Sequence, residues 1–184
     1  KFFTQNFLSG ETKGGKSGET IFFKKFTPLT SGLVTLTCQA LAKDEGGGVS
    51  SSIGLMAQKF SNRRVQWTCT ENGWSFWIGR IDSTGFPYSD QPLGEFEESG
   101  EDVIAGKGSP VRLKIEVDLT KNIAWSQVEE TGPDGVPVVT RTADYPWDGA
   151  LGDISGVFVA QYNREGGAGL DIDDFTINPN LQQF

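Results

Sequence analysis

The stretch VRLKIEVDL, residues 111–119, decides the fold, because apolar and polar side chains alternate along it without a break. Successive side chains of a β-strand point to opposite sides, so a period of two is typical of a strand with one buried face. We therefore expect a strand here with its apolar side chains in a core. The inward set is Val111, Leu113, Ile115, Val117 and Leu119.

The same alternation recurs on both sides of this stretch and predicts about ten strands. Between residues 72 and 73 an Asn-Gly pair predicts a tight hairpin turn. Residues 82–108 show no clear alternation and are expected to form a long polar loop. The predicted strands cover residues 21–26, 33–42, 52–58, 65–70, 74–81, 111–119, 123–129, 136–142, 154–163 and 170–177.

This strand pattern indicates an all-β fold class. Many short strands joined by hairpins form a sandwich or a closed barrel, and 184 residues fit one such domain. No change of composition marks a domain boundary. We expect an antiparallel two-sheet β-sandwich, with residues 1–184 as a single domain.

Composition excludes several function classes. The formal net charge is −8 and no basic stripe offsets it, which argues against a nucleic-acid partner and favours a neutral ligand or one bound through calcium. No run of 18 apolar residues predicts a membrane span. The absence of histidine removes a Ser-His-Asp triad, a histidine base and the usual zinc sites.

The two cysteines, Cys38 and Cys69, each share phase with apolar neighbours on a predicted strand. One interpretation is two small buried hydrophobic side chains. The other is a disulfide bond, which would suit a secreted protein. In simple up-down order one strand lies between the two cysteines, which argues against the bond.

Four phrases spread along the chain carry a resemblance: NFLSGETKGGK (6–16), FTPLTSGLVTL (26–36), PVRLKIEVDLTKNIAW (110–125) and GLDIDDFTI (169–177). In this order they resemble the concanavalin A-like jelly-roll superfamily, in its laminin-G-like and carbohydrate-binding-module branches. The resemblance implies two stacked antiparallel sheets, one of them often concave and ligand-binding. The superfamily also contains hydrolases, lyases and structural domains, so the site must decide the function.

The resemblance also implies a structural calcium ion near the cluster of aspartates that begins at residue 171. In related carbohydrate-binding sandwiches a late-strand aspartate helps to hold such an ion. Asp173 or Asp174 matches that place, with Glu11 or Glu19 as a possible further ligand. Calcium prefers carboxylate and carbonyl oxygens. The alternative is an edge strand that is protected by charge.

Glu116 and Asp118 resemble the first half of the Glu-x-Asp-x-x-Glu strand of laminarinase-type glycoside hydrolases. Lys121 stands where the third carboxylate of that motif belongs, so the motif is broken. A retaining glycosidase needs two carboxyl groups on one face of a groove. We therefore predict no catalytic residue here.

Three aromatic side chains are candidates for stacking on sugar rings. Trp77 is out of phase with the apolar residues of its strand, so it is expected to face away from the core. Tyr88 and Trp147 fall in predicted loops, GFPYSD and DYPWDG. For each of them a core position is the alternative.

Polar side chains complete the candidate ligand site. Gln66, Gln161 and Asn163 lie on predicted strands, out of phase with their apolar neighbours, and Arg80 lies near a strand end. Amide side chains both donate and accept hydrogen bonds, which suits a ligand rich in hydroxyl groups. The alternative is an ordinary solvated sheet surface.

These features favour a noncatalytic carbohydrate-binding module that recognises a polysaccharide or glycan. We expect it to be secreted or at the cell surface, and to be appended to a larger enzyme or surface protein. Two alternatives stay open. One is a structural or adhesion domain packed against a partner, and the other is a carboxylate-based glycoside hydrolase or lyase.

Overall fold

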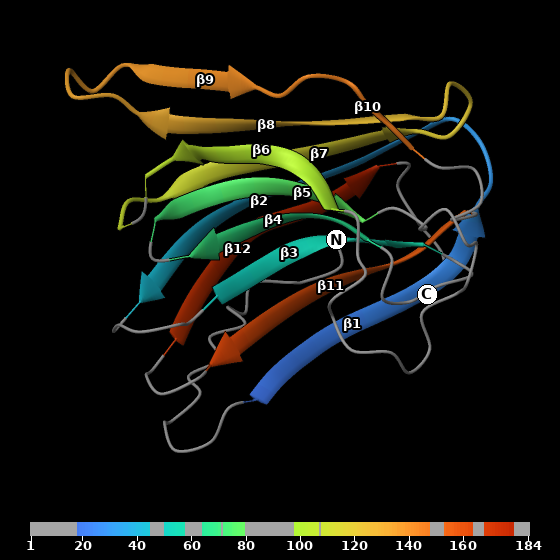
Figure 1. The fold of residues 1–184 in the computed structure, drawn as a ribbon, viewed down its shortest axis with the longest axis horizontal. Coiled ribbons are helices and arrows are strands. Elements are labelled where there is room, and N and C mark those ends of the chain that lie inside the picture. The colour runs from blue at the N-terminus through green and yellow to red at the C-terminus, as the bar shows by residue number, and fades with distance from the viewer. Residues whose placement is uncertain are drawn as a thin grey trace.

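The computed structural model describes residues 18–44, 50–57, 64–70, 72–79, 98–106, 108–147, 153–163 and 168–178. Within them the chain forms twelve β-strands and no helix (Figure 1). The strands are β1 (Gly18–Leu29), β2 (Leu33–Asp44), β3 (Ser50–Ala57), β4 (Arg64–Thr70), β5 (Gly73–Gly79), β6 (Glu98–Ala105), β7 (Val111–Asp118), β8 (Ile123–Thr131), β9 (Pro137–Arg141), β10 (Tyr145–Pro146), β11 (Ile154–Asn163) and β12 (Ala168–Asn178).

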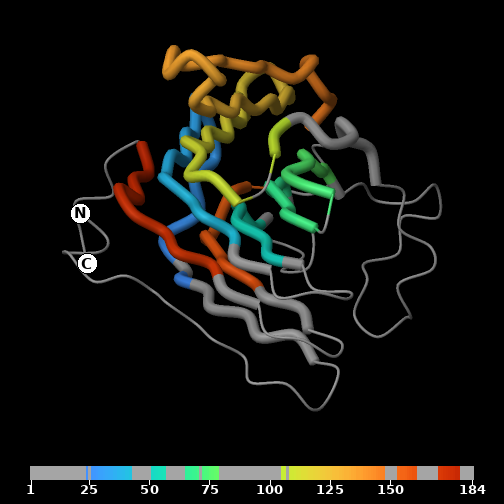
Figure 2. The backbone as a smooth tube through the Cα atoms, turned by 90° about the vertical axis from the view of Figure 1, so that its left-hand side faces the viewer, coloured from blue at the N-terminus to red at the C-terminus, as the bar shows by residue number. Residues whose placement is uncertain are grey.

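The strands build two antiparallel sheets that lie face to face (Figures 1 and 2). The first sheet has the order β1-β11-β3-β4-β5-β6. The second sheet has the order β10-β8-β7-β2-β12, and β9 also pairs with β8. The predicted two-sheet β-sandwich is confirmed. In the described residues no helix is long and apolar enough to cross a membrane.

The core fills the space between the two sheets. In β7 the residues at 111, 113, 115 and 117 are all buried, as the alternation predicts. From the first sheet Trp67 packs on Phe76 with ring centroids 5.8 Å apart. The indole Nε1–H of Trp67 also donates to the carbonyl oxygen of Lys114 in the opposite sheet, at 3.4 Å. The two sheets are thus held together by large apolar side chains from both.

Two strands have no counterpart in the sequence prediction. The strand β6 occupies residues 98–105 within the segment predicted as one loop, and β10 adds two residues of ladder to β8. Leu119, the last inward residue of the predicted strand, lies in a turn after β7, where its side chain is partly buried and packs against the main core. Its backbone N–H donates to the carbonyl of Gly32 at 2.9 Å, which extends the pairing of β2 with β7 by one residue.

The turn from β7 to β8 is organised by Asp118. Its Oδ1 accepts hydrogen bonds from the backbone N–H groups of Thr120 and Lys121, both at 3.0 Å. Its Oδ2 lies 3.3 Å from the ammonium group of Lys121. The backbone N–H of Lys121 is the strongest of several causes that lower the pKa of the Asp118 carboxyl group.

The turn carboxylate predicts a pH-dependent contribution to stability. Because the folded pKa lies below the unfolded value of about 3.9, ionised Asp118 stabilises the fold above that value. The contribution is lost as the pH falls through the folded pKa. We expect Asp118→Asn to melt at a lower temperature than the wild type at pH 7, and the gap to narrow steadily toward pH 3. Thermal melts monitored by circular dichroism at a series of pH values measure it, and a gap independent of pH would contradict the role.

Both cysteines are buried free thiols, as the first interpretation held. Cys38 lies on β2 of the second sheet and Cys69 on β4 of the first, so they belong to opposite layers rather than to nearby strands of one sheet. Burial raises the pKa of the Cys38 thiol to about 12. A thiol that stays protonated is a poor nucleophile, so Cys38 acts as a core side chain.

Candidate functional site

A row of four residues crosses the outer face of the first sheet, the face turned away from the second sheet. The register pairs Phe158 of β11 with Gly54 of β3, Gly54 with Gln66 of β4, and Gln66 with Trp77 of β5. Directly paired residues of antiparallel strands project on the same side. The row thus spans about 14 Å, since neighbouring strands are about 4.8 Å apart. We call it the Gln66 row.

The centre of the row carries an incomplete hydrogen-bond network. The amide Nε2 of Gln66 donates to Thr68 Oγ1 at 2.8 Å, and that hydroxyl lies 3.1 Å from the hydroxyl of Ser52. Gln66 is only 9% exposed, and its Oε1 is buried without a hydrogen-bond partner among the residues that the structure describes. A buried polar atom without a partner is unusual in folded proteins. The Gln66 Oε1 atom is therefore a buried acceptor whose hydrogen bond is not satisfied.

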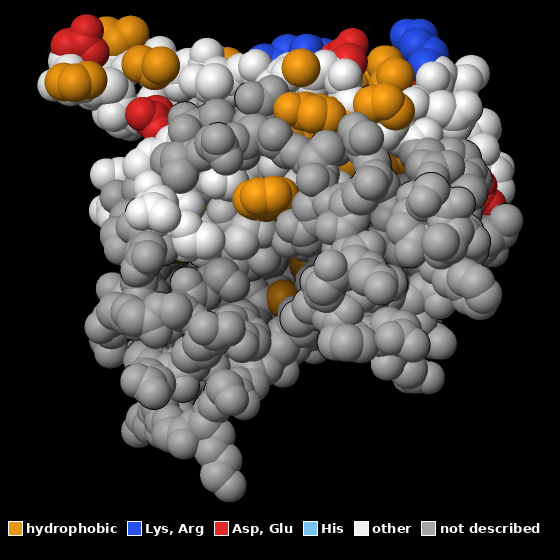
Figure 3. Space-filling view, viewed as in Figure 1, with side chains coloured by type: hydrophobic (Ala, Val, Ile, Leu, Met, Phe, Trp, Pro, Cys, Tyr) orange, Lys and Arg blue, Asp and Glu red, His pale blue; other side chains and the backbone are white. Residues whose placement is uncertain are grey.

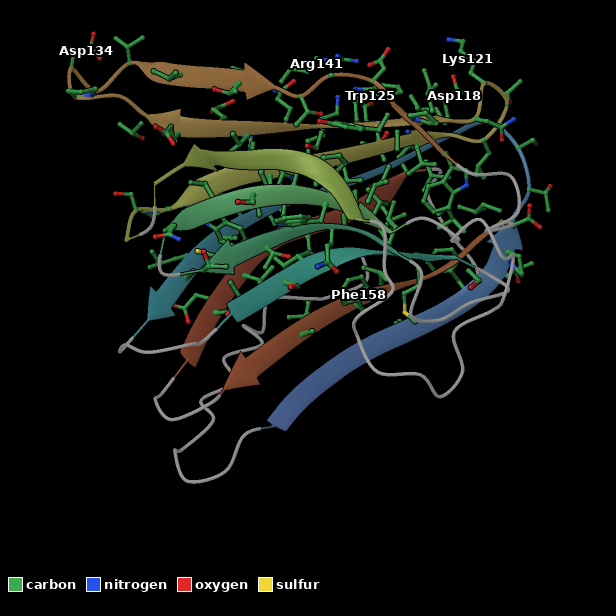
Figure 4. The ribbon with its side chains drawn as sticks, in the orientation of Figure 1. Asp118, Lys121, Trp125, Asp134, Arg141 and Phe158 are labelled. Atoms are coloured by element: carbon green, nitrogen blue, oxygen red, sulfur yellow. The ribbon has the colours of Figure 1, made fainter. Side chains whose placement is uncertain are left out.

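One end of the row is apolar. Met56, Phe158 and Ala160 form a small buried cluster that is separate from the main core, and Phe158 lies on β11 (Figure 4). A Cβ atom on Gly54 would lie 2.8 Å from Phe158 Cε1 and 2.2 Å from the carbonyl oxygen of Val65. Only glycine fits here, and its lack of a side chain lets the ring extend along the row.

The other end of the row is more open. Trp77 is partly buried, whereas Phe158 is 2% exposed, so a ligand would reach the row from the Trp77 end. The row contains an aromatic plane and an unsatisfied amide oxygen but no ionised side chain. Such a surface can stack on an apolar ring face and accept a hydrogen bond from a hydroxyl group.

Two predicted site residues meet in this row. Trp77 lies on the face opposite Trp74, Phe76 and Ile78, as its phase predicted, and Gln66 pairs with it directly. Gln66 is buried rather than solvated, which the phase alone did not indicate. Their role in ligand binding stays a prediction.

Gln161 and Asn163 lie on β11. The register pairs Gln161 with Ser51 of β3 and Asn163 with Gly18 of β1. Their side chains lie outside the described part of the structure, as do Glu11, Arg80 and Tyr88 altogether.

The expectation that Trp147 is an exposed loop aromatic is wrong. Its side chain is 2% exposed and belongs to the main core, and its backbone N–H donates to the carbonyl of Asn122 at 2.8 Å. The two-residue strand β10 pairs with β8 just before it and directs the indole inward. Trp147 therefore has no free ring face for a sugar.

The aspartates proposed for calcium lie at a bulge of β12, which is the edge strand of the second sheet. Asp174 has a φ of 50°, and its backbone N–H donates to Asp173 Oδ1 at 2.8 Å. Both side chains are exposed. No three acidic, cysteine or histidine side chains gather into a metal-binding group in the described residues. Glu11 and the side chain of Glu19 lie outside that part, so a calcium site at these two aspartates stays a prediction.

Glu116 and Asp118 both have structural bonds. Glu116 lies on the outer face of the second sheet, where it accepts from Thr35 Oγ1 at 3.3 Å and lies 2.9 Å from the Lys114 ammonium. Asp118 organises the β7–β8 turn. These two carboxylates therefore do not support a glycosidase pair.

Sequence reasoning missed Gly54 and Phe158. Two signals were present in the sequence. The first is Gly54 itself, because a glycine inside a strand often marks a close approach of neighbouring groups. Phe158 is also out of phase with Val157 and Val159 on the same strand. Neither signal told which strands are neighbours, so the row itself was not predictable.

Solved structures with this architecture include carbohydrate recognition domains. The carbohydrate recognition domain of Emp46p in its potassium-bound form aligns with a TM-score of 0.53 at 11% identity, over 95% of this chain and 88% of that chain. The Emp47p carbohydrate recognition domain aligns with a TM-score of 0.53 at 13% identity, over the same shares. An alginate lyase from Klebsiella pneumoniae aligns with a TM-score of 0.47 at 13% identity, over 79% of this chain and 59% of that chain.

The chain has the concanavalin A-like jelly-roll fold. The superfamily resemblance seen in the sequence is thereby confirmed at the level of fold. No protein-family model and no curated protein matches the sequence. At such low identities the shared fold does not by itself transfer a ligand or a reaction.

Proposed function

We propose that this chain is a noncatalytic glycan-binding domain whose ligand docks on the Gln66 row. The observation that carries the proposal is the buried, unpartnered Oε1 of Gln66 beside the partly buried ring of Trp77. A hydroxyl group of a sugar would supply the missing donor, and the indole would cover the apolar face of the ring. The lectin-like fold of the Emp46p and Emp47p recognition domains supports this assignment.

The expected ligand is a neutral polysaccharide or glycan. The chain carries a net charge of −8, and the row itself contains no cation to pair with a sulfate or uronate group. A polyanion would therefore be repelled over long range without local compensation. We further propose a secreted or cell-surface location and attachment to a larger protein, as the expected ligand class favours.

A glycan array followed by calorimetry tests the proposal, run with calcium and again with chelator because calcium dependence was expected from the resemblance. We expect binding to one class of neutral glycan. Gln66→Leu should weaken it by about fivefold or more, since a lost hydrogen bond to a buried partner costs about 1–3 kcal/mol. Trp77→Ala should weaken it by a similar factor.

Matched controls lie on the outer face of the second sheet. Gln39→Leu changes an exposed glutamine and Trp125→Ala a partly buried tryptophan, and neither should alter the affinity. Gln66→Leu should also keep or raise the melting temperature, because it removes an unsatisfied acceptor while Thr68 keeps its bond to Ser52. Unchanged affinity in both row variants, or no binding to any glycan in either buffer, would overturn the proposal.

A further inference from the structure

The β8–β9 hairpin projects beyond the sandwich and exposes apolar side chains. Its tip reaches past the neighbouring strands, and apolar side chains gather on it beside an acidic one (Figures 1 and 3). Val136 is 55% exposed, Val138 46% and Val139 52%. Val138 pairs with Glu130, and Glu130 pairs with the buried Val111, so all three residues lie on the inner face of the second sheet. Val138 is nevertheless exposed, because the first sheet does not extend over this part of the hairpin.

The turn of this hairpin is built rigidly. Gly135 has a φ of 78° and donates its N–H to the carbonyl of Gly132 at 2.9 Å, and Asp134 Oδ1 accepts from the N–H of Val136 at 3.1 Å. Asp134 lies at the tip (Figure 4). Turns of this kind hold the two strands in one register. The exposed valines are therefore presented on an ordered strand.

The free edge of β9 offers backbone hydrogen-bonding groups. Gly132 N–H donates to the Val136 carbonyl and Thr142 N–H to the Ser126 carbonyl, so the even-numbered residues turn their backbone groups toward β8. The odd-numbered residues 137, 139 and 141 then turn theirs outward. Pro137 has no N–H, but Val139 and Arg141 retain both groups. An extended segment can add to this edge as a further strand.

The charge around the exposed valines is negative. Glu129 and Glu130 on β8 and Asp134 at the tip form no ion pair within the described residues. The nearest cation of β9, Arg141, is already paired with Asp144 and lies 5.2 Å from the ring centre of Trp125. Like charge at this end, and the net charge of −8, disfavour a second copy of this chain.

We propose that β9 is a docking edge for an extended segment of a partner protein that carries alternating aliphatic and basic side chains. The aliphatic residues pack beside Val138 on one face of the hairpin, and the basic residues lie on the opposite face, which carries Val139 and Glu129. The backbone groups of Val139 and Arg141 form the new ladder. This surface is separate from the Gln66 row, so either site can fail its test without the other.

A peptide-binding experiment tests the edge. The probe is a labelled heptapeptide of alternating lysine and valine, with a glutamate-valine peptide as its charge-reversed counterpart, and binding is read by fluorescence anisotropy at low salt. We expect the lysine peptide to bind at least about tenfold more tightly than the glutamate peptide. Val139→Lys should weaken the lysine peptide by at least about tenfold, because it places a cation on the free edge.

The control variant is Leu33→Lys, which changes another exposed apolar residue to lysine at the far end of the second sheet. It should leave the peptide affinity within about twofold. Equal binding of both peptides, or an unchanged affinity in Val139→Lys, overturns the proposal. So does a wild-type dimer in sedimentation velocity that Val139→Lys dissociates, since the occupant would then be a second copy.

Discussion

Trp67→Ala is expected to lower the free energy of unfolding by about 4 kcal/mol, near the upper end for a single core truncation. Trp67 is fully buried, packs on Phe76 and donates its indole N–H to the Lys114 carbonyl across the sandwich. Truncation leaves a cavity between the sheets and removes the indole hydrogen bond to the Lys114 carbonyl. Urea denaturation monitored by circular dichroism gives the difference directly.

The matched control is Trp125→Ala. Trp125 is partly buried on the outer face of the second sheet, where its ring contacts the Arg141 guanidinium. Because most of the cavity would open to water, the loss should be less than half of that for Trp67→Ala. Equal losses at the two positions would mean that the two sheets do not pack through Trp67 as described.

Gly54→Ala is the second large effect, with an expected loss of about 3 kcal/mol from one added methyl group. The new Cβ would meet the Val65 carbonyl oxygen and the Cα of Gln66, which belong to a neighbouring strand. Backbone atoms in a paired strand cannot move aside as a side chain would. Both the ladder between β3 and β4 and the Phe158 ring must shift, so glycan binding on the Gln66 row should fall as well.

Gly106→Ala serves as the comparison for this substitution. Gly106 is exposed, and nothing lies within 4 Å of a Cβ built on it. Alanine there should be neutral or slightly stabilising, because it restricts the unfolded chain. Thermal and urea melts of both variants separate the steric effect from a general cost of replacing glycine. The glycan affinity of both variants is measured alongside. Similar stabilities for the two variants would contradict the close approach at Gly54.

The strands were predictable because each has its own alternation. Residues 111–119 and the Asn-Gly turn at 72–73 indicate their elements without reference to the rest of the chain. The observed strand β7 and the β4–β5 hairpin agree closely with these predictions. The strand β6 was not predicted because the apolar and polar residues of its sequence, ESGEDVIA, do not alternate clearly. Its partner β5, rather than its own sequence, makes it a strand.

The candidate site was only partly predictable. Phase alone placed Trp77 on the outer face, since the period of a strand is a local property. The pairing of Gln66 with Trp77 across β4 and β5 followed from their hairpin. Trp147 was misplaced because burial in a connection depends on what packs over it, and the pairing of β10 with β8 is not written in the local sequence.

The sequence by itself determined the all-β class, the turn chemistry and the side of the strand on which Trp77 and Gln66 lie. Only the tertiary structure decided that β11 lies beside β3, which brings Phe158 over Gly54 and completes the row, and that the β8–β9 hairpin extends past the sandwich. The physical reason is the sequence separation of the residues that interact. Side-chain direction follows from neighbouring residues, whereas strand order and exposure follow from contacts between residues about a hundred positions apart.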